Sequence, residues 1–372
     1  MNRMHVVITG GDGFIGRNLR IRLREHGFTN VTSIDCEDSA ERLSNSLATA
    51  DFVYHLAGVN RPKNVGEFET GNRGLTATVC DVLRRSGRKT PLAFTSSVQA
   101  VHDNPYGASK KAAEEAVARY ASDTGAAVFV FRLTNVFGKW SRPNYNSAVA
   151  TFCHNIARGI PITINDPAAL LRLVYIDDVV DALESLLTTG RGGSGDVDVG
   201  PIYETTVGEV AAMIGEIAAT RSSGFVPVVG TGLGRALSAT YASFLPPDAF
   251  SYPLSQHSDP RGMFAEILKT ADTGQFSFFT AHPGITRGGH YHHTKTERFL
   301  VVQGSARFRF RQVITEEQHE VIVNSDDVRI VETVPGWAHD ITNIGAGELI
   351  VMLWANEIFD PARSDTIPAP VV

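Results

Sequence analysis

The chain has 372 residues, of which 43% are apolar and 20% are charged, and its formal net charge is −6 at pH 7. This composition is typical of a soluble globular enzyme with two or three domains. Dispersed charges of both signs argue against a surface that binds nucleic acid or membrane. Three widely spaced cysteines, and no apolar run near the roughly 18 residues that span a bilayer, predict a cytoplasmic protein.

A glycine-rich loop lies near the start of the chain. The apolar run 5–9 predicts a buried strand, the loop follows at 10–16, and an amphipathic helix is expected over 17–26. In this setting the glycines permit a tight turn and a close approach to a pyrophosphate, which the helix N-terminus attracts. A plain glycine turn is the alternative. The predicted dinucleotide-binding residues of the loop are Gly10, Gly13, Phe14, Ile15 and Gly16.

A carboxylate follows the second expected strand. The strand 31–34 ends at Asp35, about twenty residues after the glycine loop. A carboxylate there can accept hydrogen bonds from both adenosine ribose hydroxyls and disfavours a 2′-phosphate, which favours NAD over NADP. The alternatives are a solvated loop aspartate or, together with Asp38, a turn or helix cap. A third strand, 51–58, ends in small residues such as Ala57 that leave room for the cofactor.

A tyrosine and a lysine mark the next helix. Tyr106 and Lys110 share one helical face, and the hydroxyls of 95–97 close the preceding strand. An ammonium beside a phenol stabilises the phenolate and lowers its pKa, which suits proton transfer to a carbonyl while a cofactor delivers hydride. The commoner alternative is a half-buried tyrosine beside a solvated lysine.

Strands that alternate with helices in the first half predict a doubly wound parallel sheet of the Rossmann type. The last strand of this pattern, 172–178, ends at an aspartate expected to cap a helix over 179–187. A proline-rich stretch then places a domain boundary near residue 246, which gives domains 1–245 and 246–372. Short alternating runs after the boundary predict an antiparallel, all-β sandwich or barrel.

The expected β domain contains a set of possible metal ligands. His290 and His292 occupy positions i and i+2 of a strand, so both can face one ion, and Glu297 and His339 could complete the shell from neighbouring strands. Three imidazoles and a carboxylate suit zinc, and also manganese, iron or nickel. His293 competes with His290 for the ligand role, and we favour His290. A metal-free barrel with catalytic or sugar-binding histidines is the alternative.

The first 245 residues resemble the extended short-chain dehydrogenase/reductase family. The resemblance rests on the glycine loop, the strand end His55–Gly58, Tyr106 with Lys110, and the segment 132–138. It implies that Tyr106 is the catalytic acid, that Lys110 binds the nicotinamide ribose, and that Ser96 or Ser97 orients the carbonyl. We favour Ser97. The loop between the serines and Tyr106 is shorter than is usual in the family.

The second half resembles the cupin family, whose two motifs match the spacing of the His290 to Glu297 and His339 segments. The segment 259–264 is also similar to the opening motif of cupin-fold epimerases that act on 4-keto sugar nucleotides. A proton on the carbon beside a ketone can be removed when the enolate oxygen that forms is stabilised, and a histidine can serve as the base.

Through the stretches 56–62, 137–140, 143–147, 283–286 and 290–297, the whole chain resembles the bifunctional enzymes of bacterial N-acetyl-L-fucosamine synthesis for capsule or O-antigen. This resemblance implies that the cupin epimerises C3 of a UDP-linked 4-keto-6-deoxy-N-acetylhexosamine and that the first domain reduces C4, giving UDP-N-acetyl-L-talosamine. It also implies NADPH, zinc in the cupin and a homodimer, with NAD kept open because of Asp35. The alternatives are a cupin that only binds sugar or dimerises, and an epimerase or dehydratase that recycles its cofactor internally.

Overall fold

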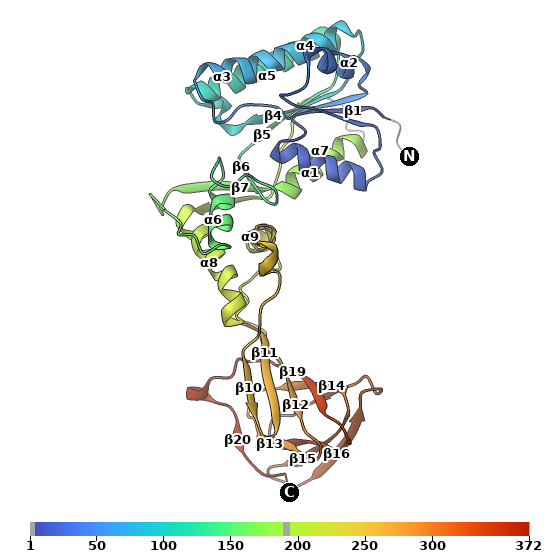
Figure 1. The fold of residues 1–372 in the computed structure, drawn as a ribbon, viewed down its shortest axis with the longest axis vertical. Helices are drawn as coiled ribbons and strands as arrows, with labels where there is room; N and C mark the ends of the chain where they lie inside the picture. The colour runs from blue at the N-terminus through green and yellow to red at the C-terminus, as the bar shows by residue number, and fades with distance from the viewer. Residues whose placement is uncertain (1–3, 189–193, 372) are drawn as a thin grey trace. The chain divides into compact units, whose positions relative to one another are not determined.

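The computed structural model describes residues 4–188 and 194–371, which form two compact units (Figure 1). The first is Met1–Gly215 with Val229–Pro246, and the second is Glu216–Val228 with Pro247–Val372. Residues 216–228 group with the second half, where the Val226 amide donates to the Lys269 carbonyl at 2.7 Å. The domains 1–245 and 246–372 stay a prediction.

A six-stranded parallel sheet forms the centre of the first unit, as the alternation of strands and helices predicted. Its central strands Val6–Thr9, Phe52–His55 and Leu92–Ser97 are almost entirely buried because helices cover both faces. Their order places β1 between β2 and β3, where the direction of winding reverses and ligands of such sheets bind. In spatial order the strands are β2 Val31–Ile34, β1 Val6–Thr9, β3 Phe52–His55, β4 Leu92–Ser97, β5 Val128–Leu133 and β8 Gly195–Asp196.

The helices of the first unit lie in two layers, with α2, α4 and α5 on one face of the sheet and α1 and α7 on the other (Figure 1). Two helices begin earlier than predicted. Helix α1 begins at Phe14 rather than residue 17, and α7 begins at Ile176, so Asp177 and Asp178 lie in its first turn and do not cap it. The bounds are α1 Phe14–Glu25, α2 Ala40–Thr49, α3 Gly66–Phe68, the π-helical η1 Glu69–Gly74, α4 Leu75–Arg85, the 3₁₀ segment η2 Val98–Val101, α5 Pro105–Thr124 and α7 Ile176–Thr188.

A second, three-stranded sheet completes the first unit. Its order is β6-β7-β9, with β6 parallel and β9 antiparallel to β7. None of the helices in the described ranges is long and apolar enough to cross a membrane. The bounds are β6 Asn135–Phe137, α6 Ala148–Ile156, β7 Leu170–Tyr175, β9 Ile202–Thr206, α8 Val207–Ser223 and α9 Gly232–Ser243.

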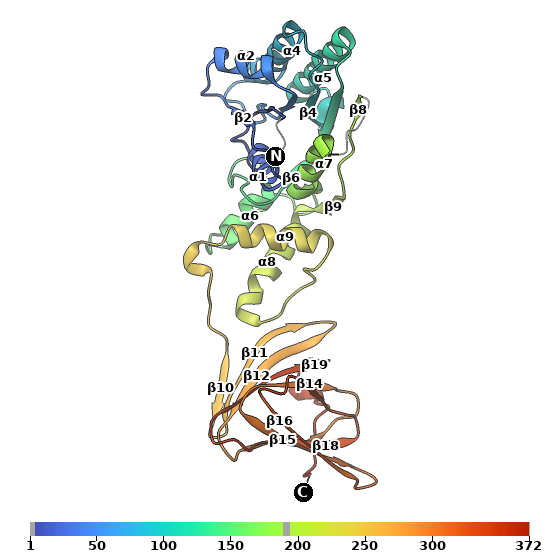
Figure 2. The same ribbon diagram turned by 90° about the vertical axis from the view of Figure 1, so that its right-hand side faces the viewer.

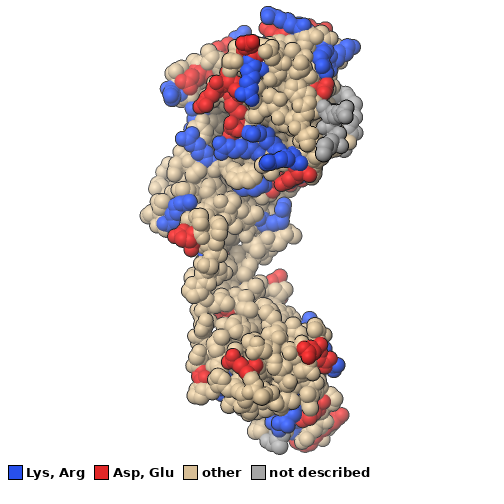
Figure 3. Space-filling model, turned by 45° about the vertical axis from the view of Figure 1, so that its right-hand side comes forward, with Lys and Arg blue, Asp and Glu red and all other residues tan. Residues whose placement is uncertain are grey.

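Charges of opposite sign lie close together on the first unit. Figure 3 shows Lys and Arg side chains beside Asp and Glu on one face of it. Arg22 pairs with Asp181, and Arg42 pairs with Asp38. The exposed pairs each contribute little to stability, about 0–1 kcal/mol.

The strands of the second unit form two antiparallel sheets that enclose an apolar core, as expected for a sandwich or barrel (Figure 2). Alternating residues of each strand face this core, and Phe299 and Phe308 meet there at a ring separation of 5.7 Å. One sheet contains β10 Gln256–Asp259, β11 Gly262–Thr270, β12 Gly274–Ala281, β19 Leu349–Ala355, β14 Glu297–Gln303 and β17 Ile330–Glu332. The other contains β16 Gln318–Asn324, β15 Ser305–Gln312, β18 Trp337–Asn343, β13 Thr286–Tyr291 and β20 Ile367–Pro368; the 3₁₀ turns are η3 Pro247–Ala249 and η4 Pro361–Arg363.

The buried side-chain amide of Asn343 hydrogen-bonds the backbone at strand ends of the second unit. The Asn343 side chain donates to the carbonyls of Ala281 and Gly347, each at 2.8 Å, and accepts from the Gly345 amide at 2.9 Å. Replacing Asn343 by alanine removes all three hydrogen bonds, of which the one to Ala281 is buried and the other two are part-buried. We expect the free energy of unfolding of the second unit to fall by roughly 2–4 kcal/mol.

Urea unfolding of the full chain, followed by circular dichroism and tryptophan fluorescence, measures this change. Asn324→Ala is the matched control, because its exposed side chain accepts one hydrogen bond, from the Asp326 amide. Equal losses in the two variants would contradict the assigned role of Asn343.

Candidate functional site

The glycine loop is packed against the end of β3. Gly10 has φ +72°, and a Cβ there would lie 2.8 Å from the Ala57 Cα. A Cβ on Gly16 would lie 2.2 Å from the Gly10 carbonyl oxygen, so the loop and the first turn of α1 are in close contact. The Gly13 amide donates to the same carbonyl at 3.1 Å. Larger residues at Gly10 or Gly16 would separate the loop from β3 and α1.

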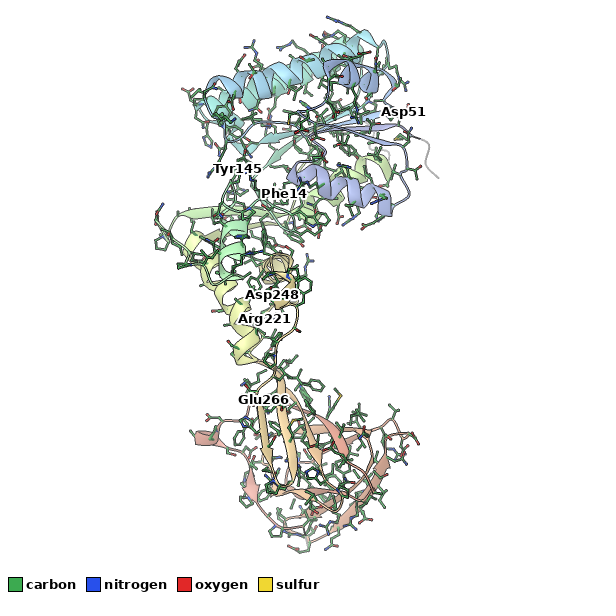
Figure 4. All side chains as sticks on the ribbon, viewed as in Figure 1. Phe14, Asp51, Tyr145, Arg221, Asp248 and Glu266 are labelled. Atoms are coloured by element: carbon green, nitrogen blue, oxygen red, sulfur yellow. The ribbon has the colours of Figure 1, made fainter. Side chains whose placement is uncertain are left out.

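The first turn of α1 directs backbone amides toward the loop. Phe14 and Ile15 are the first two residues of the helix, and Figure 4 marks Phe14 at this position. The N-cap residue is Gly13, which has no side chain that could accept hydrogen bonds from these amides. Free amides and the positive end of the helix dipole suit a phosphate group. The predicted cofactor-binding residues of the loop therefore come together in one turn.

Both oxygens of the Asp35 carboxylate accept hydrogen bonds from other residues of the chain. Oδ1 accepts from the Asp12 amide at 3.0 Å, and Oδ2 accepts from the Ser33 hydroxyl at 2.8 Å. Two arginines lie near these groups, since Arg20 pairs with Asp12 and Arg42 Nη2 is 3.4 Å from the Ser33 carbonyl. In this structure Asp35 therefore connects the glycine loop to β2, and guanidinium groups lie near both.

Helix α5 begins just before the tyrosine. The Asn104 side chain caps it by accepting from the Gly107 amide at 2.8 Å, and Pro105 occupies its first turn. Tyr106 and Lys110 therefore lie one turn apart at the N-terminal end of α5, as the sequence predicted.

The lysine side chain is buried beneath the end of β4. Lys110 is 6% exposed, its Nζ donates to the Thr95 carbonyl at 3.0 Å, and it lies 5.2 Å from the centre of the Phe94 ring. Burial lowers the pKa of the Lys110 ammonium to about 8, and the Glu114 carboxylate opposes this shift. The ammonium is therefore held at a fixed point but is easier to deprotonate than an exposed lysine.

The two serines at the end of β4 have different hydrogen-bond partners. Ser96 donates to a Glu114 carboxylate oxygen at 2.5 Å, whereas Ser97 hydrogen-bonds Tyr106. Burial raises the pKa of the Tyr106 phenol, and the hydrogen bond with Ser97 opposes the rise. This direction is opposite to the lowering by Lys110 that the sequence predicted, because desolvation of the buried phenol dominates its pKa. Tyr106 is therefore a neutral hydroxyl donor at pH 7.

An asparagine that the sequence analysis did not identify supports this site. Asn72, in η1, is buried, accepts from the Val59 amide at 2.8 Å and donates to the Ser109 hydroxyl at 2.9 Å. A Cβ on Gly58 would lie 3.0 Å from Asn72 Oδ1 and 3.2 Å from Lys110 Nζ. Asn72 thus joins the segment after β3 to α5 beside the ammonium. No local pattern predicts this role, since its partners are 13 and 37 residues away.

Four residues of the second unit form a cluster with metal-ligand chemistry. The ligand atoms of His290, His292, Glu297 and His339 lie within 4.8 Å of one another. Glu297 Oε2 is 3.3 Å from Nε2 of both His292 and His339. The histidines come from β13, β18 and the residue after β13, while Glu297 begins β14 of the other sheet. Cross-strand pairing of His290 with His339 brings the ligands of β13 and β18 together within one sheet.

The electrostatics of the cluster suit a cation. Burial favours protonation of Glu297, but hydrogen bonds from His292 and His339 and the charge of Lys295 hold its pKa well below its usual range. Lys295 Nζ is 3.1 Å from Glu297 Oε1. Burial lowers the pKa of His290 to about 4, so its imidazole is neutral at pH 7. Neutral imidazoles and an ionised carboxylate are the forms that bind divalent metals.

His293 does not join this cluster in the described part of the chain. Its backbone amide donates to the Asp365 carboxylate at 2.9 Å, and its ring lies 5.4 Å from that of Tyr291. A cavity of about 230 Å³ opens beside the cluster. Its lining includes His290, Lys295, Glu297, Phe264, Phe359 and Thr366.

Two protein-family models match the chain. The NAD dependent epimerase/dehydratase family matches residues 6–200, which include the glycine loop and the Tyr106–Lys110 pair. The polysaccharide biosynthesis C-terminal domain matches residues 257–367, which include the histidine and glutamate cluster.

Similar proteins align with nearly the whole chain. A UDP-2-acetamido-2,6-beta-L-arabino-hexul-4-ose reductase of Pseudomonas aeruginosa is 54% identical over 368 residues, which are 99% of each chain. The crystal structure of the capsular polysaccharide assembling protein CapF from Staphylococcus aureus has a TM-score of 0.91 and 39% identity, and covers 99% of this chain and all of its own. CapF with the inhibitor 3-isopropenyl-tropolone has a TM-score of 0.87 and 35% identity, with coverage of 99% and 100%.

The buried position of Lys110 makes its titration measurable. We expect its amine to titrate near pH 8 in the cofactor-free chain, below the usual lysine pKa of about 10.4, because burial disfavours the charged form. NMR of the chain labelled with ¹³C-lysine measures this titration at the ε-carbon. Lys110→Arg assigns the resonance by removing it. A midpoint near 10.4 would show that the ammonium is solvated and contradict the described site.

Proposed function

This chain belongs to the NAD-dependent epimerase/dehydratase family, and we propose that it reduces the C4 ketone of a UDP-linked 4-keto-6-deoxy-N-acetylhexosamine. The observation that carries the proposal is the group of Ser97, Tyr106 and Lys110 at the carboxyl end of β4. The name of the Pseudomonas aeruginosa relative, a reductase of a UDP-linked hexulose, supports the substrate class.

The side chains of this site can deliver a proton to a ketone oxygen. Ser97 and Tyr106 offer two hydroxyl donors, and the raised pKa of Tyr106 keeps its proton in place at pH 7. As the C4 carbonyl gains an electron pair, its oxygen takes the Tyr106 proton and becomes a hydroxyl. The positive charge of Lys110 favours the tyrosinate left behind. The hydride to C4 would come from a nicotinamide cofactor held by the glycine loop and Lys110.

NADPH is the cofactor that we propose, with NADH as the alternative. Both Asp35 oxygens already accept hydrogen bonds within the chain, which weakens the argument that they are reserved for ribose hydroxyls. Arg20 and Arg42 lie near this carboxylate and carry the charge that a 2′-phosphate needs.

We further propose that the second unit inverts C3 of the keto sugar before reduction. The product would then be UDP-N-acetyl-L-talosamine, on the path to UDP-N-acetyl-L-fucosamine for capsule or O-antigen. The four-residue cluster supports this proposal because His290, His292, Glu297 and His339 suit a divalent ion such as zinc. Such an ion polarises a carbonyl oxygen and makes the neighbouring C–H more acidic. The adjoining cavity gives a sugar access to the cluster.

A homodimer is part of the proposal. Three edge strands of the second unit pair with another described strand on one side only. They are β10 and β17 of one sheet and β16 of the other. Such edges can pair across a two-fold axis.

The reductase proposal is tested by following NADPH absorbance at 340 nm with an enzymatically generated UDP-4-keto-6-deoxy-HexNAc. Wild type should oxidise one NADPH per sugar. We expect Tyr106→Phe to lower kcat by about 10²–10⁴-fold, because the proton donor is lost, and Ser97→Ala by about 10²-fold. NADH in place of NADPH tests the cofactor in the same assay.

Ser96→Ala is the matched control for Ser97. Its hydroxyl bonds Glu114 rather than Tyr106, so we expect only a few-fold change in kcat. Equal losses in the two serine variants would contradict the assignment of Ser97. No oxidation of NADPH or NADH by wild type would overturn the reductase proposal and favour an enzyme that recycles its cofactor.

Metal content tests the proposed centre. After dialysis against buffer with zinc, wild type should retain one ion per chain by inductively coupled plasma mass spectrometry. Glu297→Ala should lose it, since the cluster's charged ligand is removed, whereas His293→Ala should retain it because His293 lies outside the cluster. Retention by Glu297→Ala, or loss in His293→Ala alone, would contradict the ligand set.

A further inference from the structure

The C-terminal residues 356–371, which we call the strap, run back over the turn that joins β13 to β14. At its start, Asn356 and Thr296 exchange hydrogen bonds of 2.9 and 3.2 Å. Near its end, β20 pairs with β13, and the Ala369 amide donates to the Gly289 carbonyl at 2.9 Å. The strap is therefore fixed at both ends beside the cluster of His290, His292, Glu297 and His339.

Asp365, in the middle of the strap, caps this turn with its carboxylate. It accepts from the backbone amides of His293 at 2.9 Å, Thr294 at 2.7 Å and Lys295 at 2.9 Å. The Thr294 hydroxyl adds a fourth donor at 3.0 Å. Burial disfavours the charged form, yet these donors hold the pKa of Asp365 well below its usual range. An ionised carboxylate thus fixes three consecutive amides.

The backbone of the same residue contacts a cluster histidine directly. His292 Nδ1 donates to the Asp365 carbonyl, and His292 Nε2 lies 3.3 Å from Glu297 Oε2. With Nδ1 donating to this carbonyl, Nε2 is the ring nitrogen that faces Glu297 Oε2 and that would bind an ion once its own proton is lost. In metal sites such an outer hydrogen bond sets the tautomer and ring orientation of a histidine ligand.

The capped turn also carries a second group that contacts the cluster. Lys295 is 8% exposed, and its Nζ is 3.1 Å from Glu297 Oε1. This contact leaves the other carboxylate oxygen facing His292 and His339. One strap residue therefore influences two ligands: His292 through the carbonyl, and Glu297 through the position of Lys295.

We propose that Asp365 is a positioning residue of the metal centre, which it pre-organises by fixing the His292 tautomer and the turn that carries Lys295. This inference rests on the proposed binding of a divalent ion by the cluster. It assigns the strap a role in the site, although the strap contributes none of the four ligands.

Zinc affinity of the full-length chain, measured by competition with a chromophoric chelator, tests the proposal. We expect Asp365→Ala to weaken zinc binding by about 10–100-fold, because loss of the carboxylate frees the turn 293–295 and lets the residue 365 carbonyl, the outer-shell partner of His292, shift. Asp360→Ala is the matched control, because this strap carboxylate caps only the short turn at Ala362, with a bond of 2.9 Å. We expect its affinity to stay within twofold of wild type.

NMR of the histidine rings separates positioning from a general loss of structure. Long-range ¹H–¹⁵N spectra of metal-free wild type should show His292 protonated on Nδ1, and Asp365→Ala should show mixed tautomers while the other histidine signals keep their positions. Asp365→Asn retains one acceptor oxygen and should lose less affinity than Asp365→Ala, which keeps the test open if the alanine variant unfolds.

Unchanged affinity and an unchanged His292 tautomer in both Asp365 variants would overturn the proposal. A different result, absence of zinc binding by wild type, would overturn the metal centre itself and this inference with it.

Discussion

The burial of the Lys110 ammonium is the constraint on which the first unit's site depends. Taking a charge out of water is costly, and the Thr95 carbonyl, the Phe94 ring and the Glu114 carboxylate offset that cost. These groups lie on β4 and α5, so the helix must stay close to the strand. A Cβ on Gly107 would lie 2.3 Å from the Gln99 carbonyl oxygen, which shows how tightly the start of α5 packs on η2. The short connection between Ser97 and Tyr106 therefore brings the two hydroxyls together.

In the second unit, the cost of burying a charge of the opposite sign is likewise offset by neighbouring groups. Its buried Glu297 carboxylate is surrounded by imidazoles from the facing sheet and by Lys295. Pairing of β13 with β18 brings His290 and His339 together, and Asp365 of the strap holds the turn that carries Lys295. A buried carboxylate with such partners stays ionised and has one oxygen directed at the histidines, which is the state that a divalent cation needs.

Features that depend on local spacing were predictable from the sequence. The parallel sheet, the all-β second half, and the proximity of His290, His292, Glu297 and His339 all follow from short motifs and periodicity. The start of α1 was placed three residues late, because glycines that look like loop residues continue into the helix through Gly16. Period-two counting favoured His290 over His293, since His293 falls on the opposite face of a regular strand, and the structure places His290 in the cluster. Asn72 and Asp365 act on residues 37 and 72 positions away, and only the fold brings them there.

Hydrogen exchange at C3 of the keto sugar tests most directly whether the chain has two sites, each for one step. In D₂O without NADPH, Tyr106→Phe should incorporate deuterium at C3 at the wild-type rate, as measured by NMR of the sugar nucleotide. Glu297→Ala should incorporate none, yet its first unit should still oxidise NADPH with a ketone of the configuration that it accepts. Loss of exchange in Tyr106→Phe, or full exchange in Glu297→Ala, would contradict the division of the reaction between the two units.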